Sequence, residues 1–390
     1  MVFLLVNHFH ALLASNRLGF LRLFLDVTFQ TTLATLLSFV IVILCGPRTI
    51  AWLRKKKIGD RPNFDQEQID RLMEGKKGTP TMGGILIIGA IAATVLLLAD
   101  LTNFYVQMAL ICLVWLGGVG AADDWLKLTL HSREQEKPTS RQGLTMLEKL
   151  LFQIGLAILL AIFTYRYSTY EASHTLFFPF FKRAHLVLPL WAFIALATIV
   201  LTGSSNAVNL TDGLDGLAAG CMGIASFAFV VLALIAGSDE FTISGRSLTE
   251  YLYLPGIPAS GQMAVLAGAM LGACLGFLWF NCNPAQVFMG DTGSLALGGL
   301  LGYIAIVIRQ ELLLLIVGGI FAAEALSVML QVSYFKYTRR KFGQGRRIFL
   351  MAPLHHHFQK RNWSEGQVVV RFWVLGAMLA MLALATVKIR

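Results

Sequence analysis

Long apolar runs, separated by short polar segments, dominate the chain. A helix that crosses a lipid bilayer needs about 20 mostly apolar residues, and ten runs approach this length. They lie near residues 23–45, 81–99, 104–122, 147–165, 186–203, 214–236, 263–280, 292–309, 312–335 and 368–387. The pattern predicts an all-α, polytopic integral membrane protein with about ten transmembrane helices, organised as one domain over residues 1–390. No cleaved signal peptide is expected, because the apolar N-terminal run lacks a small-residue cleavage pattern.

The composition agrees with this pattern. Hydrophobic residues make up 56% of the chain and charged residues 14%, whereas soluble domains carry about 25% charged residues. The five cysteines are scattered through apolar segments or at their ends, which gives neither a disulfide framework nor a metal-binding spacing. A soluble globular protein is therefore excluded. The lipid bilayer is the expected surrounding, and no nucleic-acid partner is expected.

Lysine and arginine gather in alternate loops. Segments 46–80, 123–146 and 336–367 hold most of them. Because positive charge marks cytoplasmic loops, both termini are expected on the outer, periplasmic side. Counting helices then places loops 204–213 and 281–291, which contain no lysine or arginine, on the cytoplasmic face too. For the run Lys55–Lys57, we favour a role only as a topology and headgroup anchor.

These five cytoplasmic loops carry or flank unusual polar clusters, which suggests one shared site. The first is the adjacent pair Asp123 and Asp124, with Lys127 one helical turn further on. A local salt bridge on one helix face is the plainer interpretation. The alternative is a site for Mg2+, which binds through a few carboxylate oxygens together with substrate phosphates.

Two further clusters combine acids, amides and glycines. In "NAVNLTDGLDGLA", four polar residues recur at spacings of three, and the glycines favour a loop over a helix. Turn chemistry alone would need only one or two of them. In "MGDTGSLALG", Asp291 stands where a helix N-cap would. Capping alone explains Asp291, but a helix start also binds phosphate.

Histidines and one buried acid complete the set. His355, His356 and His357 are consecutive and point in different directions, so they do not form a zinc site. One or two of them are expected to contact phosphate or to exchange protons, and a solvent-exposed linker is the alternative. Glu324 lies alone inside an apolar run, where acids are functional by default. We expect it to support the site from behind.

The motifs, taken together, resemble a known family. "KGTPTMGG", "DD…K", "NLTDGLDGLA", "NPAQVFMGDTGSLALG" and "PLHHHF" occur in the order found in phospho-N-acetylmuramoyl-pentapeptide transferases, a branch of the polyprenyl-phosphate phospho-sugar transferases. The resemblance runs from about Lys76 to the C-terminus. Segment 54–75 departs from the family pattern, and Gln359 and Lys360 follow the histidines where an acid is expected first. The conformation of these loops stays open.

The resemblance implies an activity and a place for it. A bacterial enzyme of the cytoplasmic (inner) membrane would transfer phospho-MurNAc-pentapeptide from UDP-MurNAc-pentapeptide to undecaprenyl phosphate. The products would be lipid I, an intermediate of peptidoglycan synthesis, and UMP. Mg2+ would be the cofactor, and a homodimer stays open.

The resemblance also implies roles for individual residues. Asp291 would bind the metal and take part in catalysis together with Asp123, Asp124, Lys127 and His355. Lys76, Lys127 and His355 are expected on the pyrophosphate side, and Phe288 is expected to stack on uracil. The complete set of expected substrate-binding residues is Lys76, Thr81, Asn206, Asn209, Asp212, Gly213, Leu214, Asp215, Asn281, Phe288, Ser294, Glu324, His356 and His357.

Some alternatives stay open at this stage. One carboxylate either deprotonates the lipid phosphate for direct attack, which we favour, or acts as a nucleophile that forms a phospho-enzyme. A sibling transferase that uses UDP-N-acetylglucosamine is the nearest other function. A secondary transporter is the alternative from another class. It is disfavoured, because transporters tend to show repeats and polar groups at the bilayer midplane.

Overall fold

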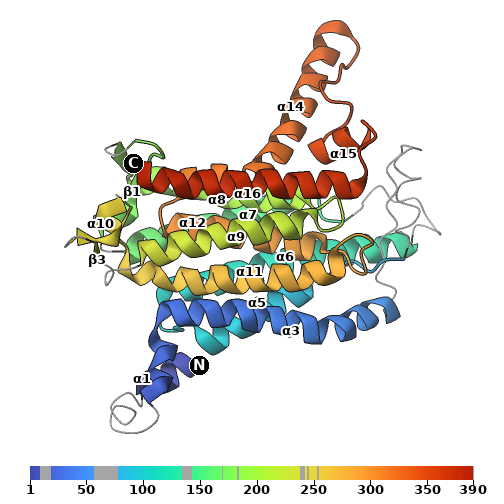
Figure 1. The fold of residues 1–390 in the computed structure, drawn as a ribbon. Coiled ribbons are helices and arrows are strands. Elements are labelled where there is room, and N and C mark those ends of the chain that lie inside the picture. Colours follow the sequence, from blue (N-terminus) through green and yellow to red (C-terminus); the bar gives the residue numbers. More distant parts are fainter. Residues whose placement is uncertain are drawn as a thin grey trace.

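The protein is a bundle of helices that run roughly parallel, with α14 and α15 projecting from one side (Figure 1). This computed structural model describes residues 1–8, 19–56, 78–133, 143–168, 170–181, 184–237, 242–243, 246–252 and 254–389. The helices are α1 (Val2–His8), η1 (Gly19–Leu25), α3 (Val27–Lys55), α5 (Gly84–Leu98), α6 (Phe104–Arg133), α7 (Met146–Tyr167), η3 (Glu171–His174), α8 (Leu190–Thr211), α9 (Leu217–Ala236), α10 (Leu248–Leu252), η4 (Pro258–Gly261), α11 (Gln262–Asn281), α12 (Gly290–Val307), α13 (Glu311–Val317), α14 (Gly319–Phe342), α15 (Leu354–Gln359) and α16 (Glu365–Ile389). Two short antiparallel pairs are β1 (Thr175–Phe177) with β2 (His185–Val187) and β3 (Thr242–Ile243) with β4 (Arg246–Ser247).

Every apolar run of the sequence corresponds to a helix or a helix pair. In the described part of the chain, eight helices are long and apolar enough to cross a membrane, and the pair α13–α14 makes a ninth if counted as one span. The tenth run forms α5, which has 15 residues and is shorter than a usual span. The prediction of an all-α, multi-pass membrane protein is confirmed.

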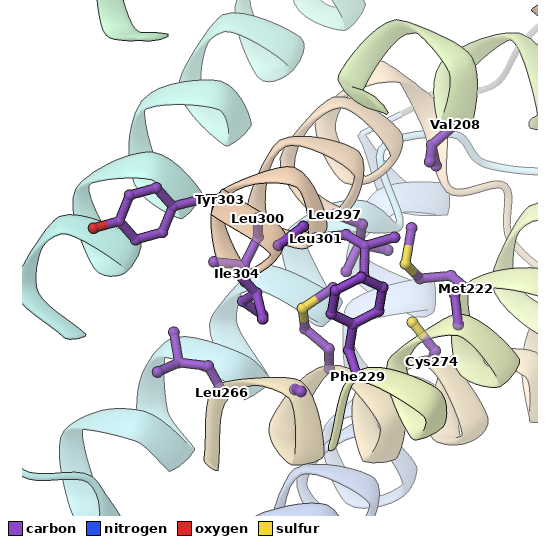
Figure 2. Packing of buried hydrophobic residues seen from close by; sticks show 14 of the residues in the cluster. Val208, Met222, Phe229, Leu266, Cys274, Leu297, Leu300, Leu301, Tyr303 and Ile304 are labelled. Atoms are coloured by element: carbon purple, nitrogen blue, oxygen red, sulfur yellow. The ribbon is translucent and has the colours of Figure 1, made fainter. Parts of the chain in front are cut away.

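The core of the bundle is built around α12 and α11. Every residue of α12 from Thr292 to Val307 is buried, and its leucines meet side chains of α9 and α11 around Phe229 (Figure 2). On α11, Gly268, Gly272 and Gly276 recur every four residues against α3, where a Cβ at Gly272 would collide with the backbone of Thr35. Small residues at this spacing allow two helix backbones to approach closely in a membrane.

Several expected element boundaries are wrong. Segments 46–80, 123–146 and 336–367 begin as helix, because α3, α6 and α14 continue to Lys55, Arg133 and Phe342. Segment 204–213 is not a loop throughout, because α8 continues to Thr211. Its polar residues stay helical because they find partners on neighbouring helices, such as Gln153 for Asn206. The run 312–335 is not one straight span either. It breaks at Gly318, and α14 turns by 87° from α13 and leaves the bundle (Figure 1).

Candidate active site

Three carboxylates converge where α6 meets the first turn of α12. Asp123 and Asp124 come from α6, and Asp291 from α12. One oxygen atom from each of the three lies within 4.8 Å of the others. Asp123 and Asp124 are buried, and the Asp291 side chain keeps 16% of its surface exposed. Three negative charges at this separation repel one another strongly unless cations lie between them.

Asp124 holds the N-terminus of α12. Its Oδ1 accepts a hydrogen bond from the Asp291 amide at 3.1 Å, and its Oδ2 accepts from the amide and hydroxyl of Thr292 at 2.9 and 2.6 Å. The first amides of a helix have no partner within the helix, so a neighbouring helix supplies the cap here. Gly290 has a φ of +73°, and a Cβ there would lie 2.7 Å from Asp124 Oδ2. This second aspartate therefore fixes the position of Asp291.

Asp123 and Asp291 share two lysines. Lys149 Nζ lies 2.6 Å from one oxygen of each carboxylate, and Lys127 Nζ lies 2.8 Å from Asp123 and 3.2 Å from Asp291. The second oxygen of Asp123 accepts from the Leu144 amide at 2.7 Å. The local salt bridge expected for Lys127 is therefore present, but it belongs to a network of four charged groups from three helices.

Lys149 was not predicted from the sequence. It lies in the first turn of α7, which begins with a capping box in which the Thr145 and Glu148 side chains accept hydrogen bonds from each other's backbone amides. The pattern Thr-x-x-Glu was legible in the sequence as a helix start. It predicted no contact with Asp123, because that contact depends on how α7 packs against α6.

The end of α8 lies beside the carboxylates. Asn209 Nδ2 donates to Ser294 Oγ at 3.0 Å, and Ser294 Oγ donates to the Gly290 carbonyl at 3.0 Å. Asp212 follows the last turn of α8. Burial, together with the negative charges of Asp291 and Asp124, raises the pKa of Asp212 to about 8. This shift favours the protonated form of a fourth carboxyl group of the site at neutral pH.

His355 and Glu324 form a second buried group. His355 Nδ1 lies 3.3 Å from Glu324 Oε1, which also accepts from the His355 amide at 3.1 Å. The imidazole ring lies directly over Gly213, where any Cβ would collide with Nε2. Glu324 therefore supports His355 from behind, and Gly213 leaves space for its ring next to Asp212.

A third group shapes the turn after Asp212. Asp215 Oδ2 accepts from Asn283 Nδ2 and from the Ala285 amide, at 3.2 and 3.1 Å. Asn281 Oδ1 accepts from the Gly216 amide at 3.0 Å, and its Nδ2 donates to the Val287 carbonyl at 2.9 Å. These two polar side chains join the turn 212–216 to segment 281–287 within the protein.

The last helix also contacts this turn. Glu365 Oε1 accepts from the Asp215 amide at 2.8 Å, and Trp373 Nε1 donates to the Gly216 carbonyl at 3.2 Å. Neither residue was predicted. Both lie about 150 residues from their partners, and a glutamate at a helix start is commonplace, so the sequence held no signal for the contact.

The other expected substrate-binding residues are placed as follows. Asn206 lies deeper and donates to Gln153 at 2.7 Å, while His356 pairs with Gln359 and His357 accepts from the Leu350 amide. Thr81 and Phe288 belong to segments 80–84 and 287–289, which pair through backbone hydrogen bonds, and Leu214 is buried. Lys76 lies outside the described residues.

The donor set fits a divalent metal ion. The three carboxylates, two within α6 and one in the first turn of α12, can offer oxygen ligands, which Mg2+ prefers. Mg2+ usually takes only one or two of them besides substrate phosphates. Since Asp124 is occupied with capping, Asp291 and Asp123 are the residues that could hold the ion. The helix N-terminus and two lysines next to them can bind phosphate oxygens.

A multi-pass helical bundle with clustered carboxylates, lysines and a helix N-terminus at one end defines a class, the membrane-embedded transferases. Comparison with known proteins gives the family. Residues 106–309 match the model of glycosyl transferase family 4, and residues 76–88 match signature 1 of the phospho-N-acetylmuramoyl-pentapeptide-transferases. The chain is 44% identical over 369 residues to the phospho-N-acetylmuramoyl-pentapeptide-transferase of Desulfotalea psychrophila, which covers 95% of this chain and 96% of the relative. The chain therefore belongs to the phospho-N-acetylmuramoyl-pentapeptide transferases and is an enzyme of that type.

Proposed function

We propose that the enzyme transfers phospho-MurNAc-pentapeptide from UDP-MurNAc-pentapeptide to undecaprenyl phosphate, forming lipid I and releasing UMP. The reaction takes place at the cytoplasmic face of the bacterial inner membrane and depends on Mg2+. The observation that carries the proposal is the contact of Lys127 and Lys149 with both Asp123 and Asp291 at the N-terminus of α12. Phosphoryl transfer requires mainly charge stabilisation and positioning, and this cluster offers both.

Each charged group has a part in the proposed reaction. Mg2+, held by Asp291, would neutralise charge on the pyrophosphate. Lys149 and Lys127 bind non-bridging phosphate oxygens and stabilise the negative charge that moves to the leaving UMP. Asp124 keeps the amides of α12 and the carboxylate of Asp291 in position. His355, which Glu324 holds over Gly213, would contact the pyrophosphate next to Asp212.

The lipid phosphate attacks directly in this proposal. Phosphate monoesters have a second pKa of about 6, so the acceptor is largely a dianion at neutral pH and needs little activation. Asp123, which contacts both lysines beside Asp291, accepts the remaining proton where the acceptor is still a monoanion. A covalent phospho-aspartate is not required.

The test is UMP release by the purified protein in lipid nanodiscs. We expect turnover with UDP-MurNAc-pentapeptide, undecaprenyl phosphate and Mg2+, and none when the metal is chelated. Asp291→Asn removes the metal-binding charge and should lower turnover by orders of magnitude. Asp26→Asn, the same change at the N-cap of α3 away from the cluster, is the matched control and should retain activity. Turnover with UDP-N-acetylglucosamine in place of the muramoyl substrate would contradict the proposed specificity.

A further inference from the structure

The C-terminal half of α14 and the segment that follows it form one body outside the bundle. Gln331 Oε1 accepts from the amides of Ile348 and Phe349, both at 3.0 Å, and its Nε2 donates to the Phe349 carbonyl at 3.1 Å. Nearer the tip, Thr338 Oγ1 accepts from the Arg346 amide at 2.8 Å. Residues 343–353 are thereby fastened along α14. We call residues 331–353 the α14 arm, and Figure 1 shows α14 reaching away from the other helices.

The arm carries a concentrated positive charge. It contains six exposed basic residues: Lys336, Arg339, Arg340, Lys341, Arg346 and Arg347. No aspartate or glutamate occurs between Glu324 and Glu365, and none of the carboxylates that the structure describes forms an ion pair with any of the six. Described carboxylates therefore do not neutralise the positive charge of the arm.

Large apolar side chains are exposed among these charges. Tyr337, Phe342, Ile348 and Leu350 each expose half or more of their surface. The ammonium group of Lys341 lies 5.6 and 5.4 Å from the ring centres of Tyr337 and Phe342, and the guanidinium of Arg346 lies 5.0 Å from that of Phe342. Aromatic rings beside basic side chains suit the boundary between acyl chains and headgroups. There the rings contact the acyl chains and the charged ends contact the headgroups.

We propose that the α14 arm is a docking surface for the anionic headgroups of the bilayer, phosphatidylglycerol being the test lipid. The positive charge of the arm is complementary to anionic headgroups. The exposed rings and aliphatic side chains of the arm can insert between the lipids in the same layer of the membrane. A small soluble anion would leave these apolar side chains in water. Each lysine or arginine near an anionic surface strengthens association by about fivefold, so three of them contribute on the order of 100-fold if independent.

The arm connects this surface to the candidate active site. Its return segment leads directly into α15, where His355 contacts Glu324 near the base of α14 and lies over Gly213. Headgroups bound to the arm would hold α14 and α15 in one relative position and thus fix His355. This consequence rests on the proposed function, whereas binding of the lipid to the arm does not.

The experiment measures binding and turnover separately. Phosphatidylglycerol is titrated into delipidated protein and bound lipids are counted by native mass spectrometry, while a photoactivatable phosphatidylglycerol maps the site. The variant Arg340→Gln/Arg346→Gln/Arg347→Gln should bind at least tenfold more weakly and lose the adducts at 336–350. The control Arg340→Lys/Arg346→Lys/Arg347→Lys keeps the charge and should stay within about twofold of the wild type.

Several outcomes would overturn the inference. Equal binding by the glutamine variant and the wild type would do so, as would an equal loss in the lysine control. A glutamine variant that keeps its lipids but needs more nucleotide-sugar would assign the arm to the pentapeptide instead. UMP release in nanodiscs should rise severalfold with phosphatidylglycerol in the wild type and not in the glutamine variant. If the wild type releases no UMP at all, the proposed function fails while the binding result still stands.

Discussion

Lys149 provides the sharpest test of how the cluster works, because it joins two carboxylates on two different helices. Its Nζ contacts Asp123 and Asp291 at 2.6 Å each, whereas Lys127 is 44% exposed and makes contacts of 2.8 and 3.2 Å. A hydrogen bond to a charged group contributes about 1.5–3 kcal/mol, so two lost bonds bound the effect at about 3–6 kcal/mol. Because Lys127 remains, we expect the lower end of this range. Lys149→Gln should raise the activation free energy of the transfer by about 3 kcal/mol, which lowers kcat by about 100-fold.

The same variant should bind Mg2+ more tightly. Lys149 and the metal compete for the carboxylate of Asp291, so removing the lysine leaves more negative charge for the ion. UMP release gives kcat, and calorimetric titration gives the Mg2+ affinity of the variant without substrate. Lys127→Gln is the matched control and should show a smaller loss, about tenfold in kcat. Weaker Mg2+ binding by Lys149→Gln, or an unchanged kcat, would refute the reasoning that this lysine acts through the carboxylates and the phosphates.

Three further predictions follow from the same network. Asp123→Asn should lower turnover most below pH 6, where the lipid phosphate keeps its proton (second pKa about 6), and turnover of the variant should recover partly at higher pH. A loss of turnover that does not depend on pH, or a phospho-enzyme trapped on Asp123, would favour the covalent route. Asp212 has a pKa of about 8, so its protonated form is favoured at pH 7. Mg2+ nearby favours the carboxylate form, and Mg2+ binding should therefore release up to about one proton at pH 7 and almost none at pH 9. Calorimetry in buffers of different ionisation enthalpy measures the number of protons released. Glu365→Gln loosens the turn 212–216 and should raise KM for the nucleotide-sugar severalfold with kcat nearly unchanged, whereas an equal fall in kcat would show that this turn acts on the chemical step.

Hydropathy predicted the helices because membrane insertion depends on the summed polarity of each segment, which is a local property. The break at Gly318 was not predictable in this way, since glycine is frequent in straight membrane helices. The end of α8 was misplaced for a related reason. Asn206 and Asn209 are typical of loops. Here they stay helical because their side-chain amides donate hydrogen bonds to Gln153 and Ser294 on other helices.

The site divides along the same line. Asp123, Asp124 and Asp291 could be chosen from the sequence because acidic residues at the ends of apolar runs are costly and therefore conspicuous. The different tasks of these three aspartates could not be predicted from the sequence, because capping by Asp124 depends on how closely α6 approaches α12. Lys149 and Glu365 act through contacts between distant helices and have no local signal. The outward orientation of both termini stays a prediction from the charge pattern.

The burial of α12 from Thr292 to Val307 has a mechanical consequence. A helix with no side toward lipid does not experience hydrophobic mismatch directly, because a thicker or thinner bilayer tilts and stretches the outer helices that meet the acyl chains. Asp291 is thus mounted on the part of the bundle that membrane thickness disturbs least. His355 reaches the same site from α15, which follows the projecting helix α14 (Figure 1). Acyl-chain length should therefore act on the histidine side of the reaction centre well before it acts on the metal side.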